Sequence, residues 1–148
     1  MLNQQYSIVI NAPPKKVWHS MLDPDTYQIW TAPFMPGSFY EGKWETGSKI
    51  LFLVEDKKGM MSGMVSKIKE SRPYEFVSIE HKGVVEDGKE KEIEELAGSL
   101  ENYTLKEIDG KTEVIVDLRG PGEIDEEWQQ EEDIWSQALQ ILKEMAEK

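Results

Sequence analysis

Alternation of apolar and polar residues with a period of two dominates the first two thirds of the chain. Near the N-terminus, Tyr6, Ile8 and Ile10 share one face, which is typical of a strand with one better-buried side. The Asp109-Gly110 pair between two alternating segments is the strongest hairpin signal in the chain. Together with turn-forming residues between the segments, the pattern predicts seven strands: Gln4–Ile10, Phe39–Trp44, Ser48–Glu55, Met60–Glu70, Tyr74–His81, Leu100–Ile108 and Thr112–Arg119.

Prolines indicate two short helices after the first strand. A proline in the first turn of a helix costs little, because its missing N–H would have no partner there, and we expect a helix over Pro13–Leu22. Asp23 and Pro24 repeat the pattern, with Asp23 as the expected cap of a second helix that runs to about Trp30.

The period changes near the C-terminus. After Pro121-Gly122, apolar residues recur at helical spacing and predict one amphipathic helix of about 24 residues, roughly 36 Å long. These apolar positions are Ile124, Trp128, Trp135, Ala138, Leu139, Leu142 and Met145. The segment Glu86–Gly98, rich in Glu, Lys and Gly, is expected to be an exposed excursion.

This order of elements predicts an α+β fold. Consecutive strands with tight joints form an antiparallel meander rather than βαβ units. The single long helix must then cover the apolar face of a twisted sheet of six to seven strands, which can curve around it. We therefore expect one helix-grip domain over residues 1–148, with two short helices between strands 1 and 2.

Short motifs along the whole chain carry a family resemblance. Ile8, Ile10, Ala12-Pro13, Val17-Trp18, Asp23-Pro24 and Trp30 resemble the opening of the START-like (SRPBCC) superfamily. Gly42, Trp44, Gly47-Ser48, Gly63, Val65 and Arg72-Pro73 are similar to bacterial homologues of the Aha-type chaperone-ATPase activator. The resemblance implies the helix-grip fold with an internal cavity between sheet and long helix. It leaves function open, because the superfamily includes lipid carriers, hormone receptors, polyketide cyclases and proteins of no known activity.

Charge and composition exclude several classes of function. The formal charge is −12, from 29 acidic and 17 basic residues. Such a chain would repel nucleic acid and anionic membranes. The acidity is explained by solubility or by a basic protein partner that meets Glu123–Asp133. No Cys is present, which removes disulfides and thiolate ligands, and no signal peptide or membrane-spanning run is visible. We expect a cytoplasmic protein.

Large apolar residues are the candidates for a binding cavity. Five Trp, four Phe and seven Met are generous for 148 residues. They form either an ordinary filled core or the wall of a ligand cavity, in which flexible Met side chains adapt to varied shapes. The predicted ligand-binding residues are Trp30, Phe34, Phe39, Trp44, Phe52, Met60, Met64, His81, Tyr103, Trp128, Trp135 and Leu139.

Few polar residues are candidates for chemistry. His81 shares strand parity with inward Val77 and Ile79, so it is either a satisfied core imidazole or a group that orients a ligand. Tyr103 and Glu101 share one face, but a charged side chain is seldom buried, so we expect Glu101 in solvent. His19 is also expected in solvent. Two distant histidines make a poor metal site, and no P-loop, dinucleotide fingerprint or GxSxG elbow is present, so we expect neither metal nor cofactor.

Three functions remain. The first is a carrier or sensor that binds a small hydrophobic or aromatic molecule in the cavity. The second is a cavity enzyme of the cyclase or hydrolase kind that uses His81, Tyr103 or Glu101. The third is an adaptor for a protein partner, as the resemblance to the chaperone-ATPase activator implies. The carrier or sensor is preferred, and an enzyme is not favoured.

Overall fold

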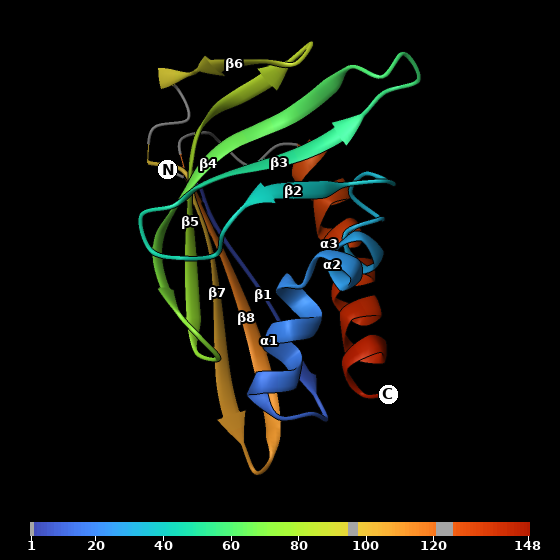
Figure 1. Cartoon of the computed structure of the whole chain (residues 1–148). Helices are drawn as coiled ribbons and strands as arrows, with labels where there is room; N and C mark the ends of the chain where they lie inside the picture. Colours follow the sequence, from blue (N-terminus) through green and yellow to red (C-terminus); the bar gives the residue numbers. More distant parts are fainter. Residues whose placement is uncertain (1, 95–97, 121–125) are drawn as a thin grey trace.

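Strands and three helices form two layers in the computed structural model, with every helix on one face of the sheet (Figure 1). The model describes the backbone of residues 2–94, 98–120 and 126–148, and the side chains of these residues except 2, 3 and 126–132. The elements are β1 (Leu2–Ile10), α1 (Pro14–Leu22), α2 (Pro24–Trp30), β2 (Phe39–Gly42), β3 (Lys49–Glu55), β4 (Met61–Arg72), β5 (Phe76–Glu86), β6 (Lys89–Glu92), β7 (Leu100–Ile108), β8 (Lys111–Gly120) and α3 (Glu126–Ala146).

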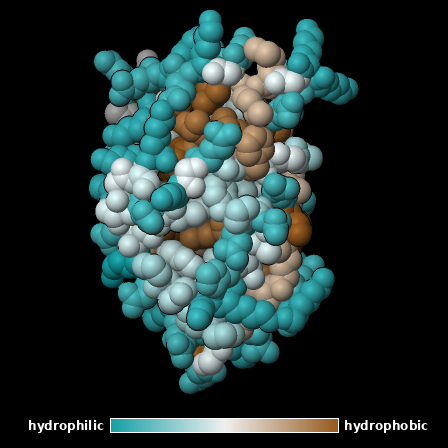
Figure 2. Space-filling model, viewed as in Figure 1, coloured by the Kyte–Doolittle hydropathy of each residue, from teal (hydrophilic) through white to brown (hydrophobic). Residues whose placement is uncertain are grey.

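The sheet is antiparallel, in the order β1-β8-β7-β5-β4-β3-β2, with β6 paired to β5 beside this path. Its curvature wraps the two short helices and α3, which runs beside β1 along the length of the molecule (Figure 1). The predicted α+β helix-grip architecture is therefore confirmed. Hydrophilic residues cover most of the surface on the face that Figure 2 shows, as the net charge of −12 leads one to expect.

A bulge in β5 accompanies the strongest bend of the sheet. Val65 of β4 pairs with Gly83 of β5, but the next residue, Ser66, pairs with His81, so that Lys82 is an extra residue. A bulge of this kind increases local twist and changes the direction of side chains. Above it, β2, β3 and β6 run across the molecule, whereas β1, β7 and β8 run along it (Figure 1).

The main core lies between the lower part of the sheet and the helices. Fully buried aliphatic side chains from α1, β1, β8 and α3 meet there: Ile10, Val17, Met21, Val114, Val116 and Leu142 are all 0% exposed. This agrees with the predicted inward faces of the first strand and the last helix.

Two details of local structure differ from the expectations. The segment expected as an exposed excursion is exposed where β6 lies, but β6 is a strand, and its four charged residues lack the alternation that predicts one. An Asp87-Gly88 turn with positive φ at both residues joins it to β5, the same hairpin signal as Asp109-Gly110. In addition, the Asp23 side chain makes no capping bond at α2 and instead lies 3.2 Å from Nδ1 of exposed His19.

Candidate functional site

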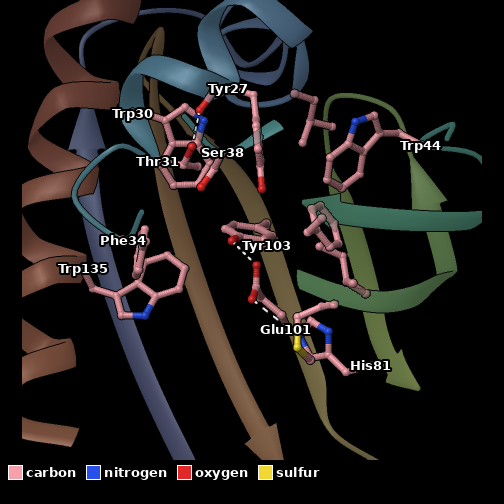
Figure 3. Close-up of a pocket in the computed structure, with 14 residues that line it drawn as sticks. Tyr27, Trp30, Thr31, Phe34, Ser38, Trp44, His81, Glu101, Tyr103 and Trp135 are labelled. Atoms are coloured by element: carbon pink, nitrogen blue, oxygen red, sulfur yellow. Dashed lines mark hydrogen bonds and ion pairs between the residues drawn. The ribbon is translucent and has the colours of Figure 1, made fainter. Parts of the chain in front are cut away.

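A pocket of about 160 Å³, partly open to solvent, lies between α2, α3 and the inner face of the sheet. Aromatic rings make up half of its wall: Tyr27, Trp30, Phe34, Trp44, Phe52, Tyr103 and Trp135. The remaining lining residues are Leu22, Met64 and Ile79, which are apolar, and Thr31, Ser38, His81 and Glu101, which are polar. Figure 3 shows these side chains converging from both helices and from the sheet.

The rings of the wall contact one another mostly edge-on or tilted, and one pair, Tyr27 and Phe52, is stacked. Tyr27 packs edge-on against Trp30 and Tyr40, with ring centroids 6.0 and 5.2 Å apart, and Phe34 meets Trp135 edge-on at 4.7 Å. The indole N–H of Trp30 donates to the Met21 carbonyl oxygen at 2.9 Å, which fixes α2 against α1. A void of about 160 Å³ remains between these rings.

One corner of the pocket is polar, and its side chains belong to a row that continues to Ser66, outside the lining. The Tyr103 hydroxyl donates to Oε2 of Glu101, and Oε1 of Glu101 lies 3.7 Å from Nε2 of His81. Nδ1 of His81 lies 2.9 Å from Oγ of Ser66, on the neighbouring strand. The side chains of His81 and Glu101 are only 17% and 25% exposed. The row therefore runs from buried Ser66 through His81 and Glu101 to Tyr103. Figure 3 shows its last three members at the pocket.

Burial and the carboxylate keep two tyrosines protonated. Desolvation raises the pKa of Tyr103 well above 10, and the nearby Glu101 charge and its hydrogen bond add to the effect. Desolvation also raises the pKa of Tyr27, again with a contribution from Glu101. Both phenols are therefore hydrogen-bond donors at neutral pH.

Eight of the predicted binding residues line this pocket: Trp30, Phe34, Trp44, Phe52, Met64, His81, Tyr103 and Trp135. Three others lie elsewhere. Phe39 is half-buried on β2 outside the lining, Met60 is 40% exposed in the turn before β4, and Leu139 is 3% exposed in the main core. The side chain of Trp128 lies outside the described residues.

Sequence reasoning missed or misplaced several lining residues. Tyr27 lies three residues before Trp30 in α2, and Thr31 is the residue that ends the helix. The separations of three and four residues from Tyr27 to Trp30 and Thr31 are helical, and this spacing could have indicated both residues. Glu101 was expected in solvent, and this was wrong, because three quarters of its side chain is buried beside Tyr103 and His81.

The row Ser66, His81 and Glu101 contains the residue types of a hydrolase triad, but the hydroxyl is inaccessible. Ser66 is 1% exposed and does not line the pocket, so a substrate there could not reach its Oγ. The geometry makes Ser66 a partner that orients the His81 ring. Within the described ranges, no group of three or more His, Asp or Glu could hold a metal ion.

A curved antiparallel sheet around a C-terminal helix, with an aromatic pocket between them, defines the helix-grip class of the START-like superfamily. Within this class the chain belongs to the family described as Activator of Hsp90 ATPase homolog 1-like protein, whose model matches residues 11–147. Comparison with curated protein sequences finds no match.

Solved structures share the fold at low sequence identity. The Aha1 dimer from Colwellia psychrerythraea is 20% identical with a TM-score of 0.74, over 99% of this chain and 97% of that one. A protein of Cytophaga hutchinsonii is 24% identical with a TM-score of 0.72, over 98% and 93% of the two chains. DynU16, from the dynemicin biosynthetic locus, is 18% identical with a TM-score of 0.66, over 96% of this chain and 46% of that one. Among the described residues, no helix is long and apolar enough to cross a membrane.

Proposed function

We propose that this protein is a carrier or sensor that binds a small hydrophobic or aromatic molecule, about the size of one aromatic ring, in the pocket between the sheet and α3. The observation that carries the proposal is the combination of seven aromatic side chains with one polar corner around a void. An apolar wall with a few convergent polar groups is the usual composition of a small-molecule site.

The size of the void limits the ligand. A closed apolar cavity of about 150 Å³ holds benzene, whereas sites for drug-sized molecules measure roughly 300–1,000 Å³. At about 160 Å³, the pocket accommodates one ring or a short chain, and a lipid with long acyl chains is too large for it. Among the hydrophobic ligands that the family resemblance implies, molecules with a single ring therefore fit this pocket better than lipids do.

Ligand-observed NMR with toluene, phenol, indole and benzyl alcohol tests the proposal, with tryptophan fluorescence as a second readout from Trp30, Trp44 and Trp135 in the wall. We expect saturable binding of at least one probe. Ser38→Phe should abolish it, because Ser38 lines the pocket and the added ring occupies the space of the ligand.

Ser7→Phe is the matched control, since Ser7 is exposed on β1 and does not line this pocket. It should leave binding unchanged. The proposal fails if no probe binds, or if Ser38→Phe and Ser7→Phe bind the probes equally well.

A further inference from the structure

The carboxylate of Glu101 accepts a hydrogen bond from the Tyr103 hydroxyl, but among the described residues it has no cationic partner at hydrogen-bonding distance. Its side chain is 25% exposed and lies against aromatic rings. Among the described residues, His81 is the one basic group whose nitrogen comes within 4.0 Å of it, and the separation of 3.7 Å is too long for a hydrogen bond. Buried carboxylates are ordinarily paired with a full positive charge or with several donors, so an ammonium group in the pocket would complete the pairing of Glu101.

The walls beside the carboxylate suit a cation as well. The faces of aromatic rings carry partial negative charge and attract ammonium groups, and cages of such rings are the common binding site for organic cations. Tyr27, Trp30, Tyr103 and Trp135 line the same pocket as Glu101. His81 and the protonated phenols of Tyr27 and Tyr103 are the titratable groups nearest to Glu101.

We infer that the pocket selects small organic cations: an amine with one ring or a short apolar group, whose ammonium binds Glu101 while its apolar part lies among the rings. The selected class rests on the proposed function, because it specifies the ligand of the same pocket. A carboxylate-bearing ligand of equal size is excluded by repulsion from Glu101.

Three probes of nearly equal shape test the selection: benzylamine, benzyl alcohol and benzoate, each titrated at pH 7 by NMR and calorimetry. Benzylamine should bind about tenfold or more tightly than benzyl alcohol, since a charged hydrogen bond and cation–π contacts together exceed the effect of a neutral hydroxyl. Benzoate should show no binding in the pocket.

Glu101→Gln keeps the shape of the side chain and removes its charge. It should bring the affinity for benzylamine close to that for benzyl alcohol while leaving benzyl alcohol unchanged. Glu107→Gln is the matched control: it changes the net charge equally, on an exposed position of the same strand β7. It should preserve the preference, which separates the pocket from general attraction to an acidic surface. If Glu101→Gln does not fold, Glu101→Met tests the same point with an apolar chain of equal length.

The outcomes distinguish this inference from the proposed function. Equal binding of benzylamine and benzyl alcohol by the wild type overturns the cation preference and leaves the pocket a neutral binding site. A preference that persists when Glu101 is replaced also overturns it, because the selection then arises elsewhere. Binding of none of the three, nor of the neutral probes above, rejects the proposed function itself.

Discussion

The two ends of the gripped helix are packed in opposite ways. At the C-terminal end of α3, aliphatic side chains such as Ile10, Val17 and Leu142 are completely buried. Around Trp135, the core is aromatic, with Phe34 edge-on and Tyr6 stacked against the indole, and a void of about 160 Å³ remains. The hollow of this fold therefore lies at its aromatic end, whereas the aliphatic end is filled.

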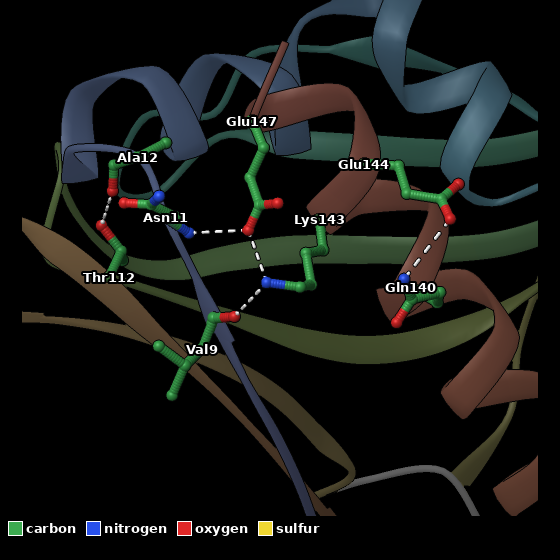
Figure 4. Close-up of polar contacts among 8 residues, drawn as sticks. All are labelled: Val9, Asn11, Ala12, Thr112, Gln140, Lys143, Glu144 and Glu147. Carbon is green, nitrogen blue, oxygen red and sulfur yellow. Dashed lines mark hydrogen bonds and ion pairs between the residues drawn. The ribbon is translucent and has the colours of Figure 1, made fainter.

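Polar groups follow the same division. At the filled end, Thr112 Oγ donates to the Ala12 carbonyl at 2.7 Å, Lys143 Nζ donates to the Val9 carbonyl at 3.0 Å, and Glu147 accepts from both Lys143 and the Asn11 N–H (Figure 4). At the hollow end, the Tyr103 hydroxyl and Nδ1 of His81 are also paired, but the Trp44 indole N–H makes no hydrogen bond of ordinary geometry.

Deleting a side chain from the filled end should have the largest effect. Leu142→Ala leaves a new cavity among fully buried neighbours and should lower the free energy of unfolding by about 2–5 kcal/mol. Met64→Ala enlarges a void that already exists and should cost only about 1 kcal/mol. Urea unfolding of both variants measures the contrast, and equal losses would show that the two ends are packed alike.

Alkaline pH should destabilise the hollow end next. The pKa of Tyr103 is raised in the folded protein, whereas in the unfolded chain the group ionises near pH 10. Above that pH the unfolded state therefore binds fewer protons than the folded state. The contribution of Tyr103 to the free energy of unfolding is fully present below pH 10 and decreases as the pH rises above it. In Tyr103→Phe, the free energy of unfolding should decrease less between pH 7 and pH 11 than it does in the wild type. Chemical denaturation of both proteins at pH 7, 10 and 11 measures the difference. An unchanged alkaline slope in the variant would contradict a buried, protonated phenol.

Breaking the polar contacts of the filled end should have the smallest effect. Lys143→Gln removes the ion pair with Glu147. Both side chains are partly exposed to solvent, Lys143 by 31% and Glu147 by 30%. The loss should stay below about 1 kcal/mol and should shrink in high salt. Lys106→Gln, an exposed position on β7, is the control and should change stability less. A salt-independent loss would indicate that the bond to the Val9 carbonyl, and not the ion pair, is the stabilising contact.

Periodicity predicted the architecture because it reports which residues face inward. It placed Tyr6, Ile10, Leu142 and His81 on their observed faces, but it ended the predicted strand Tyr74–His81 five residues before the end of β5, and it missed the charged strand β6. The site was harder, because alternation states the face of Glu101 but not whether that face meets a filled core or a void. The void depends on how rings that are distant in sequence are placed against one another. Tyr27 and Phe52 are an example, with ring centroids 6.1 Å apart.

The extra residue in β5 has a consequence for how the sheet could lose a residue. His81 pairs with Ser66, and Gly83 pairs with Val65, the adjacent residue of β4, so Lys82 has no position of its own in the pairing. The pairing of β3 with β4 runs past the same level without a shift. Deletion of Lys82 would therefore keep every later residue of β5 opposite its present partner and on its present face, and it would remove the local twist that the bulge adds. At this position the chain could shorten by one residue without a change of register.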